Sequence, residues 1–345
     1  MKKPATIKDI ARKLNISIST VSRAIRNASD VNSDTKKAVM ALTEELNYQP
    51  NRLALGLKQK QTHTIGVIVP NLDYVLSMMV RGIDEVALEA GYTVMVCQSN
   101  ESFGRELVNT RRLLESLVDG FIISVSSETK SFEHFKKIQE RNIPMVVFDR
   151  VTPDLIAPSV RLDNENAGFI ATEHLLEQGY KRIAILAGPK NLGISNSRMD
   201  GYLNALKKYK IKKDNDLIIH CDFNQDYAFF ATQELLAMKK RPDAIFTISD
   251  RMAIGAMLAI KKKGLRMPED IGLVGFNNEP VVSLVTPQIS SVDMSSFELG
   301  KAAAKLFIET MHNNEDMNKV EQILKPKLFI RESSQKIISI TSGKK

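Results

Sequence analysis

Apolar residues near the start of the chain recur at helical spacing. They follow an i, i+3, i+4, i+7 pattern, which predicts the buried face of a short helix. The residues in this pattern are Ile7, Ile10, Ala11 and Leu14. Thr6 and Asp9 predict a capping box at the start of this helix, and Asn15 predicts a left-handed residue at its end.

Two further helices are expected before residue 50. Ser17 predicts the N-cap of the second helix, which would bury Val21, Ala24 and Ile25. The third begins near Ser33, stops at residues 47–50, and would bury Val39, Leu42 and Leu46. Two short helices joined by a three-residue turn are the plan of a helix-turn-helix unit, so we expect an all-α domain over residues 1–50.

The rhythm changes after about residue 62 to apolar strands that alternate with helices. The clearest helices run over residues 75–90 and 164–178, each followed by a glycine. Continuous apolar strands between helices predict parallel sheets covered on both faces, here two doubly wound α/β lobes with a seam near Asp163. The predicted strands are Thr64–Val69, Thr93–Cys97, Gly120–Val125, Pro144–Phe148, Arg182–Ala187, Ala244–Ile248 and Gly272–Phe276.

Positive charge is concentrated at the start of the chain. Residues 1–62 contain 12 Lys and Arg against 5 Asp and Glu, which accounts for seven of the net +8 of the 345-residue chain. A basic module on a nearly neutral body fits a polyanionic partner bound at one end. If the charge distribution is considered alone, chance clustering on a soluble surface explains it as well as a polyanionic partner does.

Several classes of protein are disfavoured by what the sequence lacks. No glycine-rich dinucleotide or Walker motif follows a strand, the five histidines are scattered, and no nucleophile motif is found, so we expect neither an enzyme nor a cofactor or metal. The start lacks a secretory segment, no apolar run reaches about 18 residues, and the two cysteines are far apart, so we expect no membrane and a cytoplasmic location. A sugar-processing enzyme and a periplasmic solute-binding protein on the same architecture remain the alternatives.

The ordered set of motifs resembles the Lac-repressor/Gal-repressor family of bacterial transcription regulators over nearly the whole chain. The motifs are residues 5–11, 19–23, 46–51, 65–70, 272–276 and 326–332. The resemblance implies a periplasmic-binding-protein-like sensor with three crossing strands and an effector in the cleft between its lobes. It divides the chain into residues 1–50, a hinge helix and linker at 51–62, and a core at 63–345. Within the core we expect an N-lobe at about 63–162 and 291–323 and a C-lobe at about 163–290 and 324–340.

The second helix carries the candidate DNA contacts, because a recognition helix meets base edges with its N-terminal residues. The exposed positions there are Ile18, Ser19, Thr20 and, one turn on, Arg23. Arginine bonds guanine bidentately, serine adapts to several bases and isoleucine can meet a thymine methyl. By resemblance, Ile18, Ser19 and Arg23 read bases, whereas Thr6, Ser17, Ser22 and Asn27 hold phosphates. The alternatives are that Ser17 only caps its helix and that Arg23 is merely solvated.

The segment after Pro50 is a candidate hinge. Asn51 can cap a helix that runs to Lys58, but this length is marginal in water and Gly56 weakens it, so we expect it to fold only against a partner. By resemblance Leu57 wedges the central base step of the minor groove and Lys58 is the basic residue after it. The alternative for Leu57 is an apolar residue in a tether.

Candidate effector contacts follow strand ends, where open α/β sheets bind ligands. They are Asp149, Arg150, Arg198, Phe223, Ser249, Asp250 and Asn277. By resemblance the polar groups bond hydroxyls and Phe223 stacks on the ligand. Ser249 or Asp250 could instead be a helix N-cap, Asp149 could merely end a strand, and Phe223 could be core. Asn277 stands where the family usually has Asp, which argues against a cationic effector.

These observations predict a DNA-binding transcription regulator, most simply a repressor. It would bind a palindromic operator in double-stranded DNA as a homodimer, since each head reads one half-site. A small-molecule effector, a carbohydrate or sugar derivative, would control it from the cleft.

Overall fold

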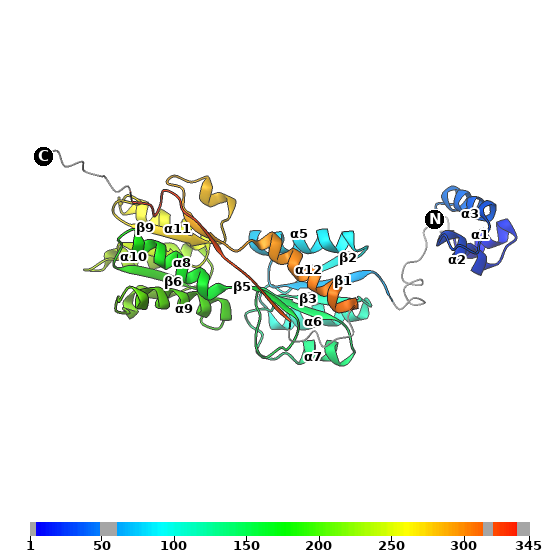
Figure 1. The fold of residues 1–345 in the computed structure, drawn as a ribbon, viewed down its shortest axis with the longest axis horizontal. Helices are drawn as coiled ribbons and strands as arrows, with labels where there is room; N and C mark the ends of the chain where they lie inside the picture. Colours follow the sequence, from blue (N-terminus) through cyan, green and yellow to red (C-terminus); the bar gives the residue numbers. More distant parts are fainter. Residues whose placement is uncertain (1–4, 49–60, 313–319, 337–345) are drawn as a thin grey trace. The chain divides into compact units, whose positions relative to one another are not determined.

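A computed structural model describes residues 5–48, 61–312 and 320–336 (Figure 1). The chain divides into one unit over residues 1–62 and a second over 63–345. Asn51, Leu57 and Lys58, with the expected hinge helix, lie outside the described residues.

The first unit contains the helix-turn-helix that the periodicity predicts. Its helices are α1 (Ile7–Leu14), α2 (Ile18–Ile25) and α3 (Ser33–Glu45). The amide of Thr6 donates to the Asp9 carboxylate at 2.9 Å, and Asn15 ends α1 in the left-handed conformation, so both predictions are confirmed. Ile10, Val21 and Val39, one residue from each helix, are fully buried in a small common core.

The second unit is built on two sheets, each with six strands among the described residues. The first has the order β11-β5-β4-β3-β1-β2, and the second β12-β10-β9-β8-β6-β7. All pairs are parallel except β10 with β12. The first sheet comprises β1 (Thr64–Val69), β2 (Thr93–Gln98), β3 (Gly120–Ile123), β4 (Met145–Phe148), β5 (Ser159–Leu162) and β11 (Glu321–Leu324). The second comprises β6 (Ile183–Ala187), β7 (Ile218–His220), β8 (Ala244–Thr247), β9 (Gly272–Phe276), β10 (Ser290–Asp293) and β12 (Lys327–Phe329).

Helices cover both sheets, as continuous apolar strands require. In the first lobe α5 packs on α12 and α6 on α7, and in the second α8 packs on α9 and α10 on α11 (Figure 1). The first-lobe helices are α5 (Tyr74–Glu89), α6 (Phe103–Glu115), α7 (Glu133–Glu140) and α12 (Ser296–His312). The second-lobe helices are α8 (Asn164–Glu177), α9 (Gly193–Lys208), α10 (Gln225–Ala237) and α11 (Asp250–Lys262), with the short turns η1 (Asn215–Leu217) and η2 (Pro280–Ser283). None of the helices in the described part is long and apolar enough to cross a membrane.

The chain passes between the lobes three times in its described part: after β5, after β10 and between β11 and β12. All seven strands predicted from apolar runs are present. The resemblance implied crossing strands, but the apolar runs did not locate β5, β10, β11 and β12, because these strands are short and mix polar with apolar residues. Since β10 pairs with β9, residues 291–293 belong to the second sheet, and the expected lobe boundary at 291 falls after Asp293 instead.

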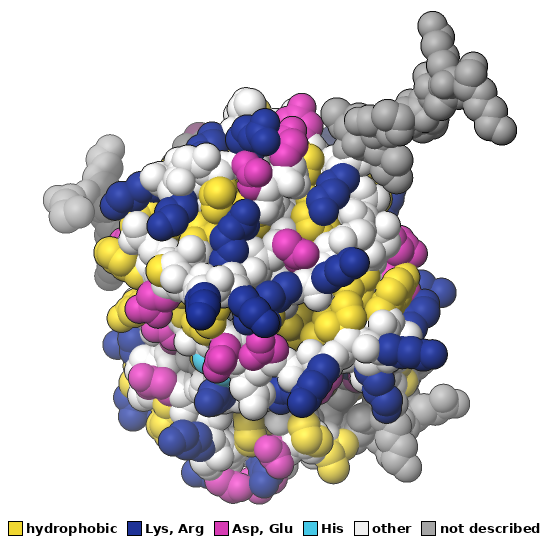
Figure 2. Space-filling model, turned by 90° about the vertical axis from the view of Figure 1, so that its left-hand side faces the viewer, with side chains coloured by type: hydrophobic (Ala, Val, Ile, Leu, Met, Phe, Trp, Pro, Cys, Tyr) yellow, Lys and Arg dark blue, Asp and Glu magenta, His cyan; other side chains and the backbone are white. Residues whose placement is uncertain are grey.

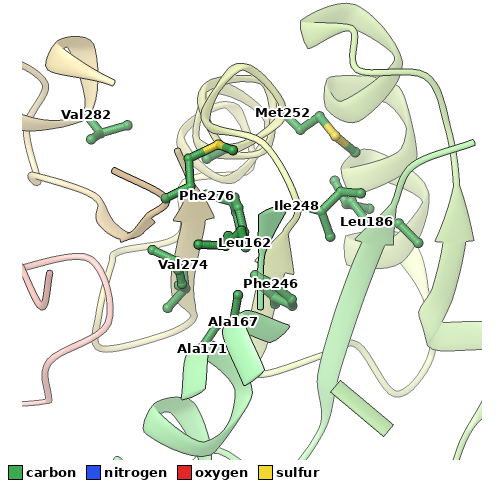
Figure 3. Packing of buried hydrophobic residues seen from close by; sticks show 14 of the residues in the cluster. Leu162, Ala167, Ala171, Leu186, Phe246, Ile248, Met252, Val274, Phe276 and Val282 are labelled. Carbon is green, nitrogen blue, oxygen red and sulfur yellow. The ribbon is translucent and has the colours of Figure 1, made fainter. Parts of the chain in front are cut away.

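The second lobe is packed around small residues on α8. Figure 3 shows Ala167 and Ala171 beside Phe246 of β8 and Val274 of β9, all fully buried. On the other side of α8, a methyl group on Gly168 would overlap the backbone carbonyl of Arg198 on α9. The approach of α9, and hence the position of Arg198, therefore depends on the absence of a side chain at Gly168.

We expect Gly168→Ala to lower the free energy of unfolding by about 1–3 kcal/mol, because the added methyl forces α8 and α9 apart. Urea unfolding of the variant measures this. Gly104→Ala is the control, because a methyl there meets only the Ser102 hydroxyl at 3.9 Å and alanine favours a helix. Equal stability of the two variants would contradict the close approach.

Candidate functional site: a reading helix and an interlobe cavity

The exposed face of α2 carries the predicted base readers. Ile18 is 45% exposed, and Ser19 and Arg23 are also exposed, whereas Val21 and Ala24 on the opposite face are buried. An exposed isoleucine on a helix of only eight residues is available to a partner surface. The structure thus brings Ile18, Ser19 and Arg23 to one side of the helix, while Thr20 is half-buried.

The predicted phosphate contacts lie at helix ends, and several already have partners within the chain. The Ser17 hydroxyl accepts the amide of Thr20 at 3.0 Å, so it caps α2 as its alternative interpretation supposed. The Thr6 hydroxyl donates to Asp9 at 2.7 Å, and Ser22 lies 3.3 Å from a guanidinium nitrogen of Arg26. Asn27 is exposed in the left-handed conformation after α2. Capping does not prevent a hydroxyl from also meeting a phosphate, because it has two lone pairs and a rotatable proton.

Arg23 is paired with Asp30, which lies on the loop before α3. The guanidinium Nε donates to the carboxylate at 3.2 Å, and a terminal nitrogen also contacts it. Both side chains are about half exposed, and such pairs contribute about 1 kcal/mol or less. A guanine edge or a phosphate can therefore compete for this guanidinium at small cost.

The second unit contains an open cavity of about 80 Å³ between its lobes, with polar and apolar groups in its lining. Six of the seven predicted effector residues line it: Asp149, Arg150, Arg198, Phe223, Ser249 and Asn277. Four polar residues that the sequence reasoning missed also line it: Asn71, Asp73, Arg251 and Glu279. Each of these follows the carboxyl end of β1, β8 or β9 by a few residues, so a longer search window at strand ends would have found them.

Arg198 is held rigidly in the cavity wall. It is 3% exposed, its Nε donates to the Asn164 side chain at 2.8 Å, and one Nη donates to the carbonyl of Ile248 at 3.0 Å. Its guanidinium lies 3.7 Å from the centre of the Phe276 ring. Burial lowers the pKa of Arg198 to about 10, although Asp149 opposes the shift, so the group remains charged at neutral pH.

Asp149 is buried at the carboxyl end of β4 in a strained conformation. Its φ is +60°, which is unfavourable for a residue with a side chain and is typical of functional sites. Burial raises the pKa of its carboxyl, and the nearby charges of Arg150 and Arg198 partly counteract this. Asp149 therefore offers a carboxylate whose hydrogen bonds to a ligand would be strengthened by the dry surroundings.

Arg150 lines the cavity but is already neutralised. Its two terminal nitrogens donate to Glu101 at 2.7 and 2.8 Å, and the same carboxylate accepts the amide of Ser127 at 2.8 Å. Burial acts to raise the pKa of Glu101, but the bonds from Arg150 outweigh it and the pKa lies below its ordinary value. Arg150 thus shapes the wall, and its charge is not free for a ligand.

Asp250 is the one predicted effector residue that the structure does not bring into the cavity. It is fully buried, and its carboxylate accepts the Ser291 hydroxyl and the Glu279 amide, both at 2.7 Å. It therefore ties the crossing strand β10 to the loop after β9. Ser249 makes no side-chain capping bond and lines the cavity, while Phe223 both lines it and packs partly buried against the core.

The loop after β3 is anchored by a buried carboxylate. Glu106 accepts the Ser126 amide at 2.8 Å and the Thr129 hydroxyl at 2.7 Å, and it pairs with His134 at 3.0 Å. Burial acts to raise the pKa of Glu106, but these bonds outweigh it and the pKa lies below its ordinary value of 4.5. This anchoring fixes the loop that forms the first-lobe rim of the cleft.

Comparison with known proteins agrees with this geometry. Residues 6–51 match the family described as bacterial regulatory proteins, lacI family, and residues 62–332 match the periplasmic binding proteins and sugar binding domain of the LacI family. The chain belongs to the LacI family of bacterial transcriptional regulators. It is a DNA-binding repressor of this family with an effector-controlled sensor, and since the family is non-enzymatic, the prediction that it is not an enzyme is confirmed.

Several LacI-family relatives match over nearly the full length. The ribose operon repressor of Halalkalibacterium halodurans is 32% identical over 331 residues, 96% of this chain and 97% of the relative. The repressor CytR of Escherichia coli K12 is 32% identical over 332 residues, 96% of each chain.

Solved LacI-family structures show the same fold. The Lac repressor dimer bound to operator and the anti-inducer ONPF matches with a TM-score of 0.88 and 28% identity, over 97% of this chain and 100% of the other. The regulator CelR in complex with cellobiose matches with a TM-score of 0.72 and 27% identity, over 95% and 99%. The predicted fold class and family resemblance are therefore confirmed.

We expect Glu106→Gln to destabilise the protein by about 1–3 kcal/mol at neutral pH, because the amide cannot satisfy all three donors. A carboxyl whose pKa is depressed by folding stabilises the protein above its ordinary pKa, and this contribution is lost as the pH falls through that range. The difference from the parent should therefore shrink below about pH 4.5. Urea unfolding of both proteins between pH 3.5 and 7.5 measures it, and a difference that does not vary with pH would contradict the assignment.

Proposed function

We propose that this LacI-family repressor binds a palindromic operator as a homodimer and that a sugar or sugar derivative in the interlobe cavity controls its affinity. The observation that carries the proposal is the presence in one chain of an exposed reading face on α2 and a polar cavity at the carboxyl ends of β-strands. The α2 face can recognise a DNA sequence. The cavity can bind a ligand, and a ligand that binds one conformation more tightly would change the affinity for DNA.

DNA contact is assigned to the first unit. Ile18, Ser19 and Arg23 would read bases, with Thr20 beside them at the start of the helix, and Thr6, Ser17, Ser22 and Asn27 would hold phosphates. In the hinge, Asn51 would cap the helix, Leu57 would wedge the minor groove and Lys58 would follow it. The net charge supports this division, because residues 63–345 carry only +1 of the total +8. On the face of the molecule in Figure 2, Lys and Arg are interspersed with Asp and Glu.

A carbohydrate effector is supported by the cavity lining. Asp149, Arg198 and Asn277 present acceptors and donors that match hydroxyl groups, and Phe223 supplies an apolar ring. Among the matching structures, CelR is bound to cellobiose, and a LacI-family regulator from Enterococcus faecium is bound to ribose (TM-score 0.69, 26% identity, 79% of this chain and 99% of the other).

A homodimer is supported by exposed apolar residues on the second lobe. Tyr227 and Phe230 on α10 are 60% and 61% exposed, and Leu284 after η2 is 80% exposed. A second copy would bury such residues. Two heads would then face two half-sites, and an effector that moves the lobes would change the spacing of the two hinge segments. Coupling of this kind is typically about 1–3 kcal/mol.

Arg23→Ala should relax discrimination by about 1–3 kcal/mol at a single base pair of the operator. Gel-shift titration against an operator and its single-base variants, selected from random DNA by the parent protein, measures this. Lys37→Ala, which changes an exposed charge on α3, is the matched control and should leave the base preference unchanged. A uniform loss over all sequences would instead make Arg23 a phosphate contact.

Arg198→Lys should abolish the response to effector and leave operator affinity unchanged, because lysine cannot make both the Asn164 and Ile248 bonds and still face the cavity. A reporter strain grown on a panel of sugars, combined with a gel shift of the purified variant, provides the test. Arg241→Lys, on the second lobe outside the cavity lining, is the control. A normal response in Arg198→Lys would place the effector elsewhere.

A further inference from the structure

The amino ends of four strands of the second sheet form a surface on the side of the second lobe away from the cleft. In both lobes the residues after the carboxyl ends of strands line the cleft, so the amino ends face away from it. Helix-to-strand connections lead into β6, β7, β8 and β9, which are neighbours in the sheet. With the last four residues of each preceding helix, these connections are residues 174–182, 205–217, 234–243 and 259–271, which we call the second-lobe pole.

The second-lobe pole is strongly basic, although the unit that contains it is nearly neutral. It has 14 Lys and Arg against 7 Asp and Glu, a net charge of +7, whereas residues 63–345 together carry +1. The matching connections of the first lobe, before β2, β3 and β4, have 3 Lys and Arg against 4 Asp and Glu over residues 86–92, 112–119 and 137–144. Positive charge is therefore gathered at the second-lobe end of the unit, and Figure 2, which views the molecule from that end, shows Lys and Arg side chains spread over it.

Hydrogen bonds and an ion pair join the four connections into one continuous surface. The carboxylate of Asp243 before β8 accepts the backbone amide of Arg182 before β6 at 2.8 Å. The Arg182 guanidinium pairs with Asp214 before β7 at 2.6 Å, and Arg241 before β8 donates to the carbonyl of Asp270 before β9 at 3.0 Å. The carboxylates of Asp243 and Asp214 therefore already have partners inside the pole.

The basic side chains of the pole are mostly exposed and mostly without a carboxylate partner. Twelve of the 14 are exposed, and the other two are Arg182 and Arg241. Over the described residues, the ion pairs of the pole are those of Arg182, Lys208 and Arg266. The exposed lysines outside these pairs include Lys207, Lys210, Lys212, Lys213, Lys239, Lys240 and Lys263.

The composition of the pole fits a phosphate backbone better than a protein surface. Protein interfaces are depleted in lysine and depend on aromatic and other large anchors. Within the pole, Tyr209, which is 37% exposed, is the one large apolar side chain at the surface. The unstacked bases of a single strand also need aromatic platforms, so the lysines suit the phosphates of a duplex, which carries one negative charge for about each 1.7 Å of its axis.

We propose that the second-lobe pole binds duplex DNA without regard to sequence, as a contact separate from the reading helices. Lysine ammonium groups contact phosphates there, and such contacts hold a duplex without reading its bases. The second unit begins at His63, next to the amino end of β1, so the DNA-reading unit is attached to the lobe opposite the pole. The duplex at the pole is therefore a second segment, and the protein joins it to the one held by the reading helices.

Two triple variants separate the pole from the rest of the surface. Both replace three exposed lysines by glutamine, so they change the net charge equally and disturb no buried group. The pole variant is Lys212→Gln with Lys213→Gln and Lys240→Gln, and the matched control is Lys137→Gln with Lys305→Gln and Lys325→Gln, all outside the pole.

The experiment holds the full-length protein by its reading helices on a short immobilised operator duplex, selected from random DNA by the parent. A labelled duplex of unrelated sequence is then added, and its retention is measured between about 50 and 200 mM salt. We expect the parent and the control variant to retain it. The pole variant should bind it about tenfold or more weakly at the lowest salt, with a salt dependence reduced by about two to three counterions, because each lost phosphate contact removes about one. Operator binding should be equal in all three proteins, which also checks that the variants are folded.

Three results would overturn the proposal while leaving operator recognition intact. If the operator-bound parent retains no labelled duplex at the lowest salt, the pole does not bind DNA. If the pole variant and the control variant retain the duplex equally, the second segment is held elsewhere. Vesicles that contain phosphatidylserine, and polyglutamate, are tested in place of the duplex. If either is retained more tightly than the duplex and is lost in the pole variant alone, the pole belongs to an anionic membrane or to an acidic protein instead.

Discussion

The sensor unit depends on one constraint, which is that the chain passes between its two parallel sheets three times at adjacent edges. Parallel strands place their carboxyl ends at one edge, so the loops after β1, β4, β8 and β9 converge on the cleft. The crossing segments begin or end at short strands. In one of these strands, β10, the Ser291 hydroxyl donates to the Asp250 carboxylate of α11 in the second lobe. These segments are the covalent connections between the lobes in the described part of the chain.

Two of the arginines that line the cavity are already bound within the chain. Arg150 is bound by Glu101, and Arg198 is held by neutral acceptors over an aromatic ring beside Asp149. Buried charges of this kind are costly unless they are paired or hydrogen-bonded, and both guanidinium groups have partners within the chain. The lining still offers the Asp149 carboxylate and the Asn277 amide to a ligand.

The DNA-reading unit follows a different principle. Its core is small, its helices have eight to thirteen residues, and the side chains of Ser17 and Asn32 cap the starts of α2 and α3. Under the proposed function, the Ser17 hydroxyl that caps α2 would also meet a phosphate, so local stability and DNA contact would use the same side chain. The pair of Arg23 with Asp30 is half exposed and therefore weak, so the guanidinium of Arg23, the proposed base contact, can exchange partners at small cost.

Local sequence determined the elements of this protein, because a buried helix face or strand leaves a periodic apolar pattern and caps require particular side chains. These local patterns were enough to predict α1 to α3 and the seven strands with apolar runs. They also predicted six of the residues that line the cavity, because those residues follow strand ends. Tertiary structure alone decided the rest. Glu101 reaches Arg150 across 49 positions, Asp250 turns inward to Ser291, and the mixed polar strands at the crossings become strands only because a neighbouring strand supplies their hydrogen bonds. Contacts between residues far apart in the chain leave no periodic trace, and for that reason only the folded chain reveals them.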